Sequence, residues 1–257
     1  MPDNDIPRKL PAAAGLAWIK GGFALYRKNP LLLGAGFGAF FALMVLLGFV
    51  PVVGGALTEL ISPILIAGFM AAFRALDQGE ELELPHFFAG FTRAPLQLAT
   101  VGAVYLAVVM LTAWLALRMG FSPSEWMKAA QQDKIDPQTA RHLMQTTLPA
   151  LLLAAVVMLP AFMATWFAPP LILFGGAAPL QALAISLKAC LHNWLALFVY
   201  SLAITLVLFL GMLIPFMLGL LVAGPILFGS LYASYQAIFA VWTEEGGPAP
   251  AAPESRL

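Results

Sequence analysis

The sequence predicts an all-α integral membrane protein with six transmembrane helices, and two properties of its composition lead to this class. Of 257 residues, 61% are hydrophobic and 10% are charged, whereas a soluble domain carries about 25% charged residues. The charges are also unevenly placed, because no Asp, Glu, Lys or Arg lies between His142 and Lys188 or between His192 and Glu244. Each gap is much longer than the roughly 20 apolar residues that one crossing needs, so each must contain more than one crossing.

The apolar runs are continuous, which predicts helices, because a membrane barrel would show short strands of alternating hydrophobicity. The first run begins at Pro30 and is longer than the apolar core of a signal peptide, so we expect it to be retained as a span. The expected crossings lie close to residues 31–50, 53–74, 96–117, 148–174, 195–215 and 218–240.

Lysine and arginine residues predict the orientation of these spans. If the N-terminus is cytoplasmic, the cytoplasmic segments hold nine cations, which are Arg8, Lys9, Lys20, Arg27, Lys28, Arg74, Arg93, Lys188 and Arg256. The periplasmic side then holds four, all in one loop: Arg118, Lys128, Lys134 and Arg141. This excess on one side follows the positive-inside rule. It predicts a multi-pass protein of a bacterial inner membrane with both termini in the cytoplasm.

A short motif recurs along the chain and predicts three tandem hairpins. Residues 63–68 (PILIAG) resemble residues 225–229 (PILFG), and residues 170–175 (PLILFG) supply a third copy. A polar residue follows each motif's proline by eleven positions, namely Arg74, Gln181 and Gln236. Because each hairpin crosses the membrane twice, the three units share one orientation and form a parallel rather than an inverted repeat.

An amphipathic segment precedes the first span of each hairpin, at residues 16–28, 84–93 and 180–192. We expect helices that lie flat at the cytoplasmic interface, with apolar side chains in the acyl boundary and cations toward anionic headgroups. The candidate lipid-binding cations are Lys20, Arg27, Lys28, Arg93 and Lys188. The alternative is that each segment is a cytoplasmic elbow packed on its own hairpin, which requires the same amphipathicity.

These assignments give one membrane domain, residues 12–243, between cytoplasmic ends that we expect to be disordered, residues 1–11 and 244–257. The repeat units cover approximately residues 12–77, 81–178 and 179–241, and the middle unit carries a periplasmic insertion at 118–147. Within the insertion, Ser122-Pro123 and Asp136-Pro137 each predict the start of a short helix, because the first residue of each pair can cap it and proline favours the first helical position.

Glu59, with Thr58 beside it, is the most informative candidate for a site because it lies inside the second expected span. An intramembrane carboxylate is costly and often marks an ion or substrate path. No cation is expected inside the membrane to pair with it, so it is either protonated or faces a wet cavity. The alternative, which the sequence favours slightly, is that Glu59 reaches the periplasmic surface or accepts a hydrogen bond at the turn, since it lies only about 10 Å deep at 1.5 Å per residue.

Prolines inside the spans are the second group of candidates. Pro63, Pro170 and Pro225 each predict a helix kink, and broken helices line transport sites in some membrane proteins. One such proline in every hairpin favours a shared structural role, because neighbouring helices can satisfy the released backbone groups. Thr165 and Trp166, in the irregular fourth span, are candidates to line a cavity. A close approach between helices is expected at the small residues Gly34, Gly36 and Gly38.

Other classes of site are not indicated. Cys190 is the single cysteine, which excludes an internal disulfide and disfavours a thiolate metal site, and His86, His142 and His192 lack ligand spacing. The sequence contains no phosphate-binding loop, nucleophile elbow or paired-carboxylate signature, and its net charge of zero gives no footprint for nucleic acid. We therefore expect no enzyme activity, cofactor, metal or nucleic-acid partner. The acidic residues Asp77, Glu80, Glu81 and Glu83 predict a solvated loop, with partner docking as the second interpretation.

Part of the chain resembles an uncharacterised family of proteobacterial, chiefly betaproteobacterial, inner-membrane proteins. The resembling segments are residues 18–23 (WIKGGF), 26–30 (YRKNP), 51–54 (PVVG), 63–68 (PILIAG) and 74–79 (RALDQG). The rest of the chain matches mainly by its pattern of spans. More distantly, the three-hairpin plan is similar to the membrane domain that accompanies some glycerophosphodiester phosphodiesterases. Their catalytic domain has no counterpart in these residues, so the resemblance implies topology and not that activity.

Two classes of function follow from these expectations. The first is a non-catalytic scaffold that binds membrane lipids, a protein partner or a second copy of the chain through its basic interfacial helices and acidic loop. The alternative is a small transporter or channel with a path near Glu59 and the kinks at Pro63, Pro170 and Pro225. The shortage of polar groups inside the membrane favours the first, because coupled transport of a charged substrate needs more than one buried ionisable group.

Overall fold

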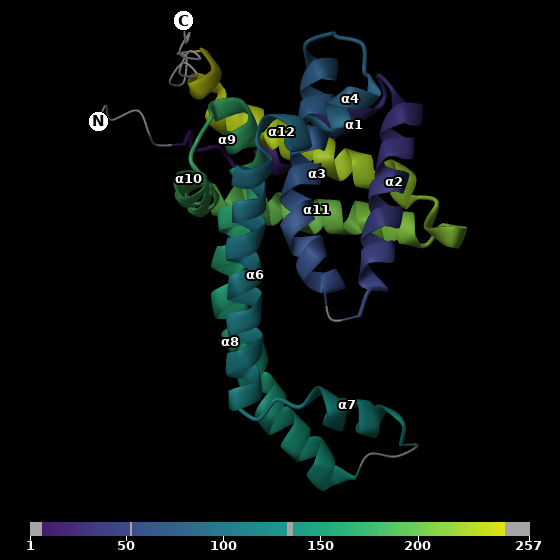
Figure 1. Cartoon of the computed structure of the whole chain (residues 1–257), viewed down its shortest axis with the longest axis vertical. Helices are drawn as coiled ribbons and strands as arrows, with labels where there is room; N and C mark the ends of the chain where they lie inside the picture. Colours follow the sequence, from purple (N-terminus) through teal and green to yellow (C-terminus); the bar gives the residue numbers. More distant parts are fainter. Residues whose placement is uncertain (1–6, 52, 133–135, 245–257) are drawn as a thin grey trace, which may run out of the picture.

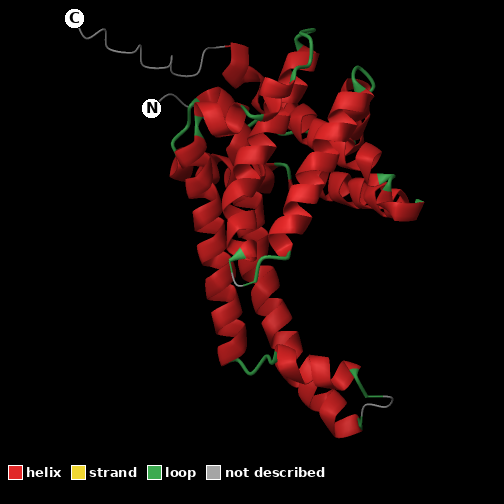
Figure 2. Cartoon of the chain, turned by 45° about the vertical axis from the view of Figure 1, so that its right-hand side comes forward, coloured by secondary structure: helices red, strands yellow, loops and turns green. Residues whose placement is uncertain are grey.

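A computed structural model describes residues 7–51, 53–132 and 136–244, and within these ranges the chain is helical and contains no β-strand (Figures 1 and 2). The elements are α1 Ala14–Tyr26, α2 Pro30–Gly48, α3 Gly54–Asp77, α4 Leu84–Phe87, α5 Ala89–Arg93, α6 Pro95–Arg118, α7 Pro123–Ala130, α8 Pro137–Trp166, α9 Ala168–Gly175, α10 Pro179–His192, α11 Trp194–Met212, the short 3-10 helix η1 Pro215–Met217 and α12 Leu220–Glu244.

The described residues contain six segments that are long and apolar enough to cross a membrane, and these confirm the expected spans. The segments are Pro30–Gly48, Gly54–Asp77, Pro95–Arg118, Pro137–Gly175, Trp194–Met212 and Leu220–Phe239. Their burial differs strongly: 67% of the last apolar window and 50% of the α3 window are buried, against 11% for α2 and 6% for the α8–α9 segment. Helices α3 and α12 are therefore the inner helices, and most apolar side chains of α2 and α8 face outward.

The insertion between α6 and α8 follows the expected capping pattern at both starts. The Ser122 hydroxyl accepts a hydrogen bond from the Glu125 N–H at the start of α7. The Asp136 carboxylate accepts the N–H groups of Gln138 and Thr139 at 2.9 and 3.0 Å, and hydrogen bonds from Thr139 lower the pKa of Asp136. The prediction of a second short helix is wrong, however, because α8 runs unbroken from Pro137 through Pro149 to Trp166. Nothing between Asp136 and the span stops a helix.

The three hairpins do not share one direction. In Figure 1, α2, α3, α6 and α8 run roughly along the long axis, whereas α11 and α12 lie across them. The second hairpin extends furthest and carries α7 at its end, away from α1, α4, α9 and α10. The protein therefore differs from a bundle of six aligned helices, although the order of hairpins is the expected one.

Helix α1 packs against the third hairpin, in contact with both α11 and α12. Glycines permit this approach, since a Cβ atom at Gly15 would lie 2.4 Å from the carbonyl oxygen of Ala196, and one at Gly22 would lie 2.4 Å from the backbone nitrogen of Ser230. Trp18 is 3% exposed and its ring meets that of Tyr200 edge-on at 5.9 Å. The face of α1 that carries Trp18 is thus buried in protein, which differs from both interpretations of residues 16–28, a flat interfacial helix and an elbow on its own hairpin.

The other two amphipathic segments, unlike α1, each cover the hairpin that precedes them in the chain. Helices α4 and α5 pack on α3, where a Cβ atom at Gly68 would lie 2.0 Å from the Phe87 carbonyl oxygen and one at Gly90 would lie 2.1 Å from that of Ile64. Helix α10 packs on α8 and α9. The expected single helix over residues 84–93 is divided at Phe88.

The N-terminal segment is tied to the third hairpin as well. The buried Asn193 side chain accepts the Leu10 N–H at 2.8 Å and donates to the Arg8 carbonyl at 3.0 Å. The Arg8 N–H donates to the Ile238 carbonyl at 3.1 Å. Part of the segment 1–11, which we expected to be disordered, is therefore held in place, namely residues 7–11. Residues 1–6 and 245–257, including Arg256, lie outside the described ranges, and so do the loop residues Asp133 and Lys134.

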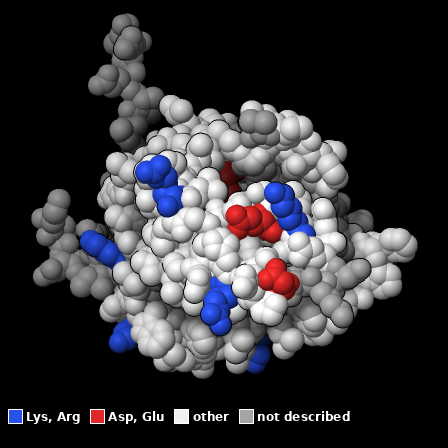
Figure 3. All heavy atoms as spheres, turned by 90° about the horizontal axis from the view of Figure 1, so that it is seen from below, with Lys and Arg blue, Asp and Glu red and all other residues white. Residues whose placement is uncertain are grey.

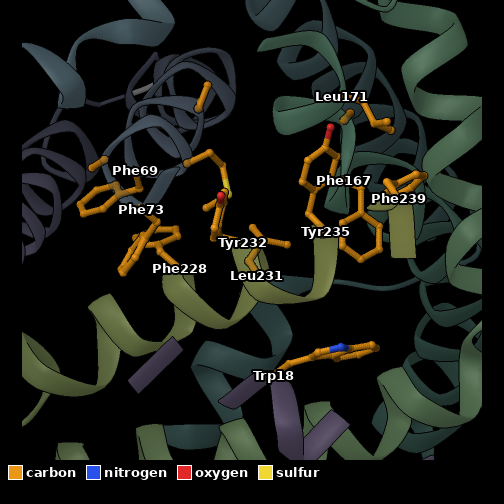
Figure 4. Packing of buried hydrophobic residues seen from close by; sticks show 14 of the residues in the cluster. Trp18, Phe69, Phe73, Phe167, Leu171, Phe228, Leu231, Tyr232, Tyr235 and Phe239 are labelled. Atoms are coloured by element: carbon orange, nitrogen blue, oxygen red, sulfur yellow. The ribbon is translucent and has the colours of Figure 1, made fainter. Parts of the chain in front are cut away.

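The core lies where α3, α9 and α12 meet. Phe69 and Phe228 stack with ring centroids 4.4 Å apart, and Tyr235 packs against Phe239. Figure 4 shows these side chains converging from α3, α9 and α12, with Trp18 of α1 on the other side of α12. All three hairpins and α1 thus contribute to a single core.

Candidate intramembrane binding site

A cavity of about 330 Å³ lies between the three hairpins and borders this core. Its walls come from α3, α6, the end of α8, the start of α9, and α12. The polar side chains among its lining residues are Glu59, Ser62, Tyr105, Thr165 and Trp166. The remaining lining is apolar or glycine: Pro63, Ile66, Gly102, Phe162, Pro169, Leu227, Phe228 and Leu231. We call this space the Glu59 cavity.

Glu59 lies in the second turn of α3 and is partly buried. Within the described residues its carboxylate has neither an ion pair nor a hydrogen bond. Thr58, the other candidate of this pair, is not part of the cavity lining. Its hydroxyl donates a hydrogen bond to the Gly54 carbonyl at 2.9 Å. Glu59 therefore lines the cavity, and the choice between its two interpretations stays a prediction.

Pro63 shapes this wall through its missing N–H group. A helical residue at that position would donate to the carbonyl of Glu59, four residues earlier, but proline has no N–H to give. Gly102 of α6 lies against the same carbonyl, since a Cβ atom there would be 2.3 Å from the Glu59 oxygen. Ser62 donates to the Thr58 carbonyl at 2.6 Å. Pro63 therefore frees a backbone acceptor at the seam between α3 and α6.

A second irregularity borders the cavity where α8 ends and α9 begins. The chain leaves helical geometry at Phe167, and Pro169 and Pro170 follow in the first turn of α9. Ser186 of α10 bridges the break, accepting the Phe167 N–H at 2.9 Å and donating to the Met163 carbonyl at 2.7 Å. Because neither proline donates a hydrogen bond, the carbonyl groups of Thr165 and Trp166 lose their usual helical donors, and the Phe167 N–H contacts the Thr165 carbonyl instead.

The expected proline kinks are thus only partly associated with the site. Pro63 lines the cavity, but Pro169 does so in place of the expected Pro170, and Pro225 is buried elsewhere in α12. Helices α3 and α12 continue through Pro63 and Pro225. Among the described residues, the span that is interrupted next to prolines therefore belongs to the second hairpin, where the sequence already looks irregular.

Trp166 presents an unusual polar group. Its indole Nε1 is buried and has no hydrogen-bond partner within the described residues. Its ring packs between Phe162, at 5.0 Å, and Tyr200, at 6.1 Å. A buried donor without an acceptor costs about 1–3 kcal/mol, and the same indole side chain lines the cavity.

Comparison with known proteins identifies the family. A probable inner membrane protein of Burkholderia thailandensis is 30% identical over 261 residues, an alignment that covers 93% of this chain and 96% of the relative. This chain belongs to the family of that protein. It is therefore a multi-pass inner membrane protein, as its composition and proteobacterial resemblance predict. No protein-family model matches the chain, and no solved structure matches it. The similarity to the phosphodiesterase membrane domain stays a prediction.

The candidate lipid-binding cations of this inner membrane protein lie outside the cavity. Lys20, Arg27, Lys28, Arg93 and Lys188 are all exposed. The Lys28 ammonium also donates to the Leu76 carbonyl at 2.6 Å, at the end of α3. Arg74, half-buried nearby, lies over the Phe174 ring at 4.7 Å. These cations therefore form no single pocket, although they remain available at the surface.

The insertion brings together two residues, Glu125 and His142, whose spacing in the sequence does not predict a catalytic site. His142 Nε2 lies 3.4 Å from a Glu125 carboxylate oxygen beside a hollow between α7 and α8. His86 instead accepts the Glu83 N–H at 3.0 Å, and no cluster that could hold a metal occurs in the described part of the chain. Seen from this end, in Figure 3, the few charged side chains are spread among many uncharged ones.

The sequence analysis missed several members of the cavity, among them Ser62, Gly102 and Tyr105. Tyr105 and Gly102 lie one turn apart on α6 and both face α3. The only available signal was a tyrosine inside an expected span, and no local pattern connects it with Glu59. The outcome for Thr165 and Trp166 is better, since both line the cavity as expected.

Proposed function

We propose that this inner membrane protein is a small transporter whose binding site for a positively charged organic group is the Glu59 cavity. The observation that supports this most is an unpaired carboxylate in a half-open cavity that residues of all three hairpins line. Around it lie backbone acceptors beside Pro63 and Pro169, and an acceptor-rich, partly aromatic wall favours cations. One carboxylate matches one positive charge, which fits uptake or export of a single cation better than coupled transport.

We further propose a topology for this activity. Both termini are cytoplasmic, and the three hairpins are tandem units, each covered by an amphipathic segment of another unit. The pairing of α1 with α12, of α4 and α5 with α3, and of α10 with α8 supports the repeat. No catalytic step is assigned to the protein, because the Glu59 cavity holds no nucleophile with an adjacent base.

Flux through liposomes tests the proposed transport. Tetramethylammonium is a suitable probe, since its permanent charge prevents leakage through lipid. We expect protein-dependent uptake that falls at least tenfold in Glu59→Gln, which removes the charge at nearly constant size. Thr58→Val is the matched control, one residue away and outside the cavity, and should retain uptake. Uptake equal to protein-free liposomes, or equal in wild type and Glu59→Gln, would overturn the proposal.

A scaffold that binds anionic lipid is the second candidate, and the exposure of Lys20, Arg27, Lys28, Arg93 and Lys188 favours it. Each cation near an anionic surface contributes about 1 kcal/mol. Replacing Arg27, Lys28 and Arg93 together by glutamine should then weaken retention of phosphatidylglycerol, measured by native mass spectrometry, by at least tenfold. Glu59→Gln should leave it unchanged. If the triple variant retained as much phosphatidylglycerol as the wild type, the scaffold function would be contradicted.

A further inference from the structure

A second hollow opens on the outer surface next to the Glu59 cavity. It measures about 380 Å³ and lies between α8, α10 and α11. Its lining is almost wholly apolar: Leu159, Phe162, Met163, Trp166, Cys190, Trp194, Leu197, Phe198 and Ser201. Phe162, Trp194 and Phe198 are 48%, 62% and 62% exposed, as expected for side chains that face lipid. We call this hollow the α8–α11 groove.

The groove occupies the one seam between hairpins that remains open in the described residues. The first and second hairpins are joined where α3 packs along α6, and the first and third where α2 packs on α12. Helices α8 and α11 meet where the Trp166 ring lies 6.1 Å from that of Tyr200, and α10 packs on α8 beside the groove. Lipid therefore has access to the protein between the second and third hairpins.

The groove and the Glu59 cavity share a wall. Phe162 and Trp166 line both spaces, with their rings 5.0 Å apart. The unpartnered Nε1 of Trp166 lies in this wall. Rotation of two aromatic side chains would thus join an apolar groove in the membrane to a polar cavity that holds a carboxylate.

We propose that the α8–α11 groove is the route by which a ligand dissolved in the membrane reaches the half-open Glu59 cavity, and that this ligand is an amphiphile with an ammonium head and a hydrocarbon tail. This rests on the proposed function. The head lies against Glu59, where opposite charge and the Trp166 and Phe162 rings favour a cation. The tail lies in the groove, whose apolar lining matches it.

The one ionisable group of the groove is consistent with an apolar tail. Cys190 is 1% exposed and its thiol donates to the Met163 carbonyl at 3.4 Å. Burial raises the pKa of this thiol to about 12, so it stays neutral at physiological pH. The charge in the combined space therefore lies on the Glu59 side alone, which orients an amphiphile with its head inward.

The test compares dodecyltrimethylammonium with dodecyl sulfate, which has the same tail and the opposite charge. Binding to the purified protein in maltoside detergent is measured by native mass spectrometry. Ser201→Trp fills the groove from the exposed edge of α11 without touching the Glu59 cavity. Leu202→Trp is the matched control, because Leu202 is 69% exposed and does not line the groove.

We expect one dodecyltrimethylammonium per protein, at least tenfold weaker binding in Ser201→Trp, and unchanged binding in Leu202→Trp. Ser201→Trp should still transport tetramethylammonium, which has no tail, and this result also shows that the variant folds. Wild-type binding in Ser201→Trp would overturn the entrance, and equal binding of dodecyl sulfate would overturn the choice of head. Equal tetramethylammonium uptake by the wild type and by Glu59→Gln would instead contradict the proposed function.

Discussion

Replacing Gly22 by leucine should destabilise the protein by about 3 kcal/mol, the upper end of the roughly 1–3 kcal/mol that overpacking typically costs. A Cβ atom at Gly22 would lie 2.4 Å from the Ser230 nitrogen and 2.9 Å from the Ile226 carbonyl oxygen. Both are backbone atoms of α12, which cannot rotate away like a side chain. The leucine therefore forces α1 off the third hairpin and exposes Trp18.

The sign of this effect separates two arrangements of α1. In a helix that lies free at the membrane interface, glycine to leucine is stabilising by about 0.8 kcal/mol, since glycine is a poor helix former, and the added apolar surface strengthens membrane binding. In the packed arrangement, the steric cost of the leucine exceeds this gain, so the substitution lowers the stability of the protein. The experiment thus tests the contact between the N-terminal helix and the C-terminal hairpin directly.

Thermal unfolding in detergent measures the effect, with Ala24→Leu as the matched control. Ala24 lies on the exposed face of the same helix, so its replacement should change stability by no more than about 0.5 kcal/mol. Gly22→Ala should fall between the two, because it adds the clashing Cβ atom without the rest of the leucine side chain. A Gly22→Leu protein as stable as Ala24→Leu would show that α1 does not pack on α12.

The spans could be predicted from the sequence because each depends on local chemistry. Long runs without charge have few alternatives in a membrane, and the caps at Ser122 and Asp136 act within three residues of themselves. Glu59 could be singled out for a similar reason, since the cost of a carboxylate inside a span does not depend on what surrounds it.

The partners of each element could not be predicted, because lipid and protein offer an apolar face nearly the same environment. Trp18 and Leu16 both read as apolar on α1, yet Trp18 is buried against Tyr200 and Leu16 is 48% exposed. The contact depends on Gly15 and Gly22, whose meaning appears only once α11 and α12 lie beside them. For the same reason the cavity, which joins Glu59 to Tyr105 and Trp166 from other hairpins, has no local signature.

Modification of Glu59 by a carbodiimide tests the central claim most directly, namely that this carboxyl group faces a cavity reached from the membrane. Dicyclohexylcarbodiimide is apolar and enters lipid, where it adds to a carboxylic acid and rearranges to a stable N-acylurea. Peptide mass spectrometry then locates the adduct. A water-soluble, charged carbodiimide provides the comparison, because it should reach exposed carboxyl groups such as Glu80 and Glu81 instead.

We expect the apolar reagent to modify most of Glu59, the charged reagent to leave it unmodified, and dodecyltrimethylammonium to protect it. Protection should be weaker in Ser201→Trp than in Leu202→Trp. The absence of an adduct on Glu59 with the apolar reagent would contradict the account. So would an adduct that forms equally with the charged reagent and that dodecyltrimethylammonium does not reduce.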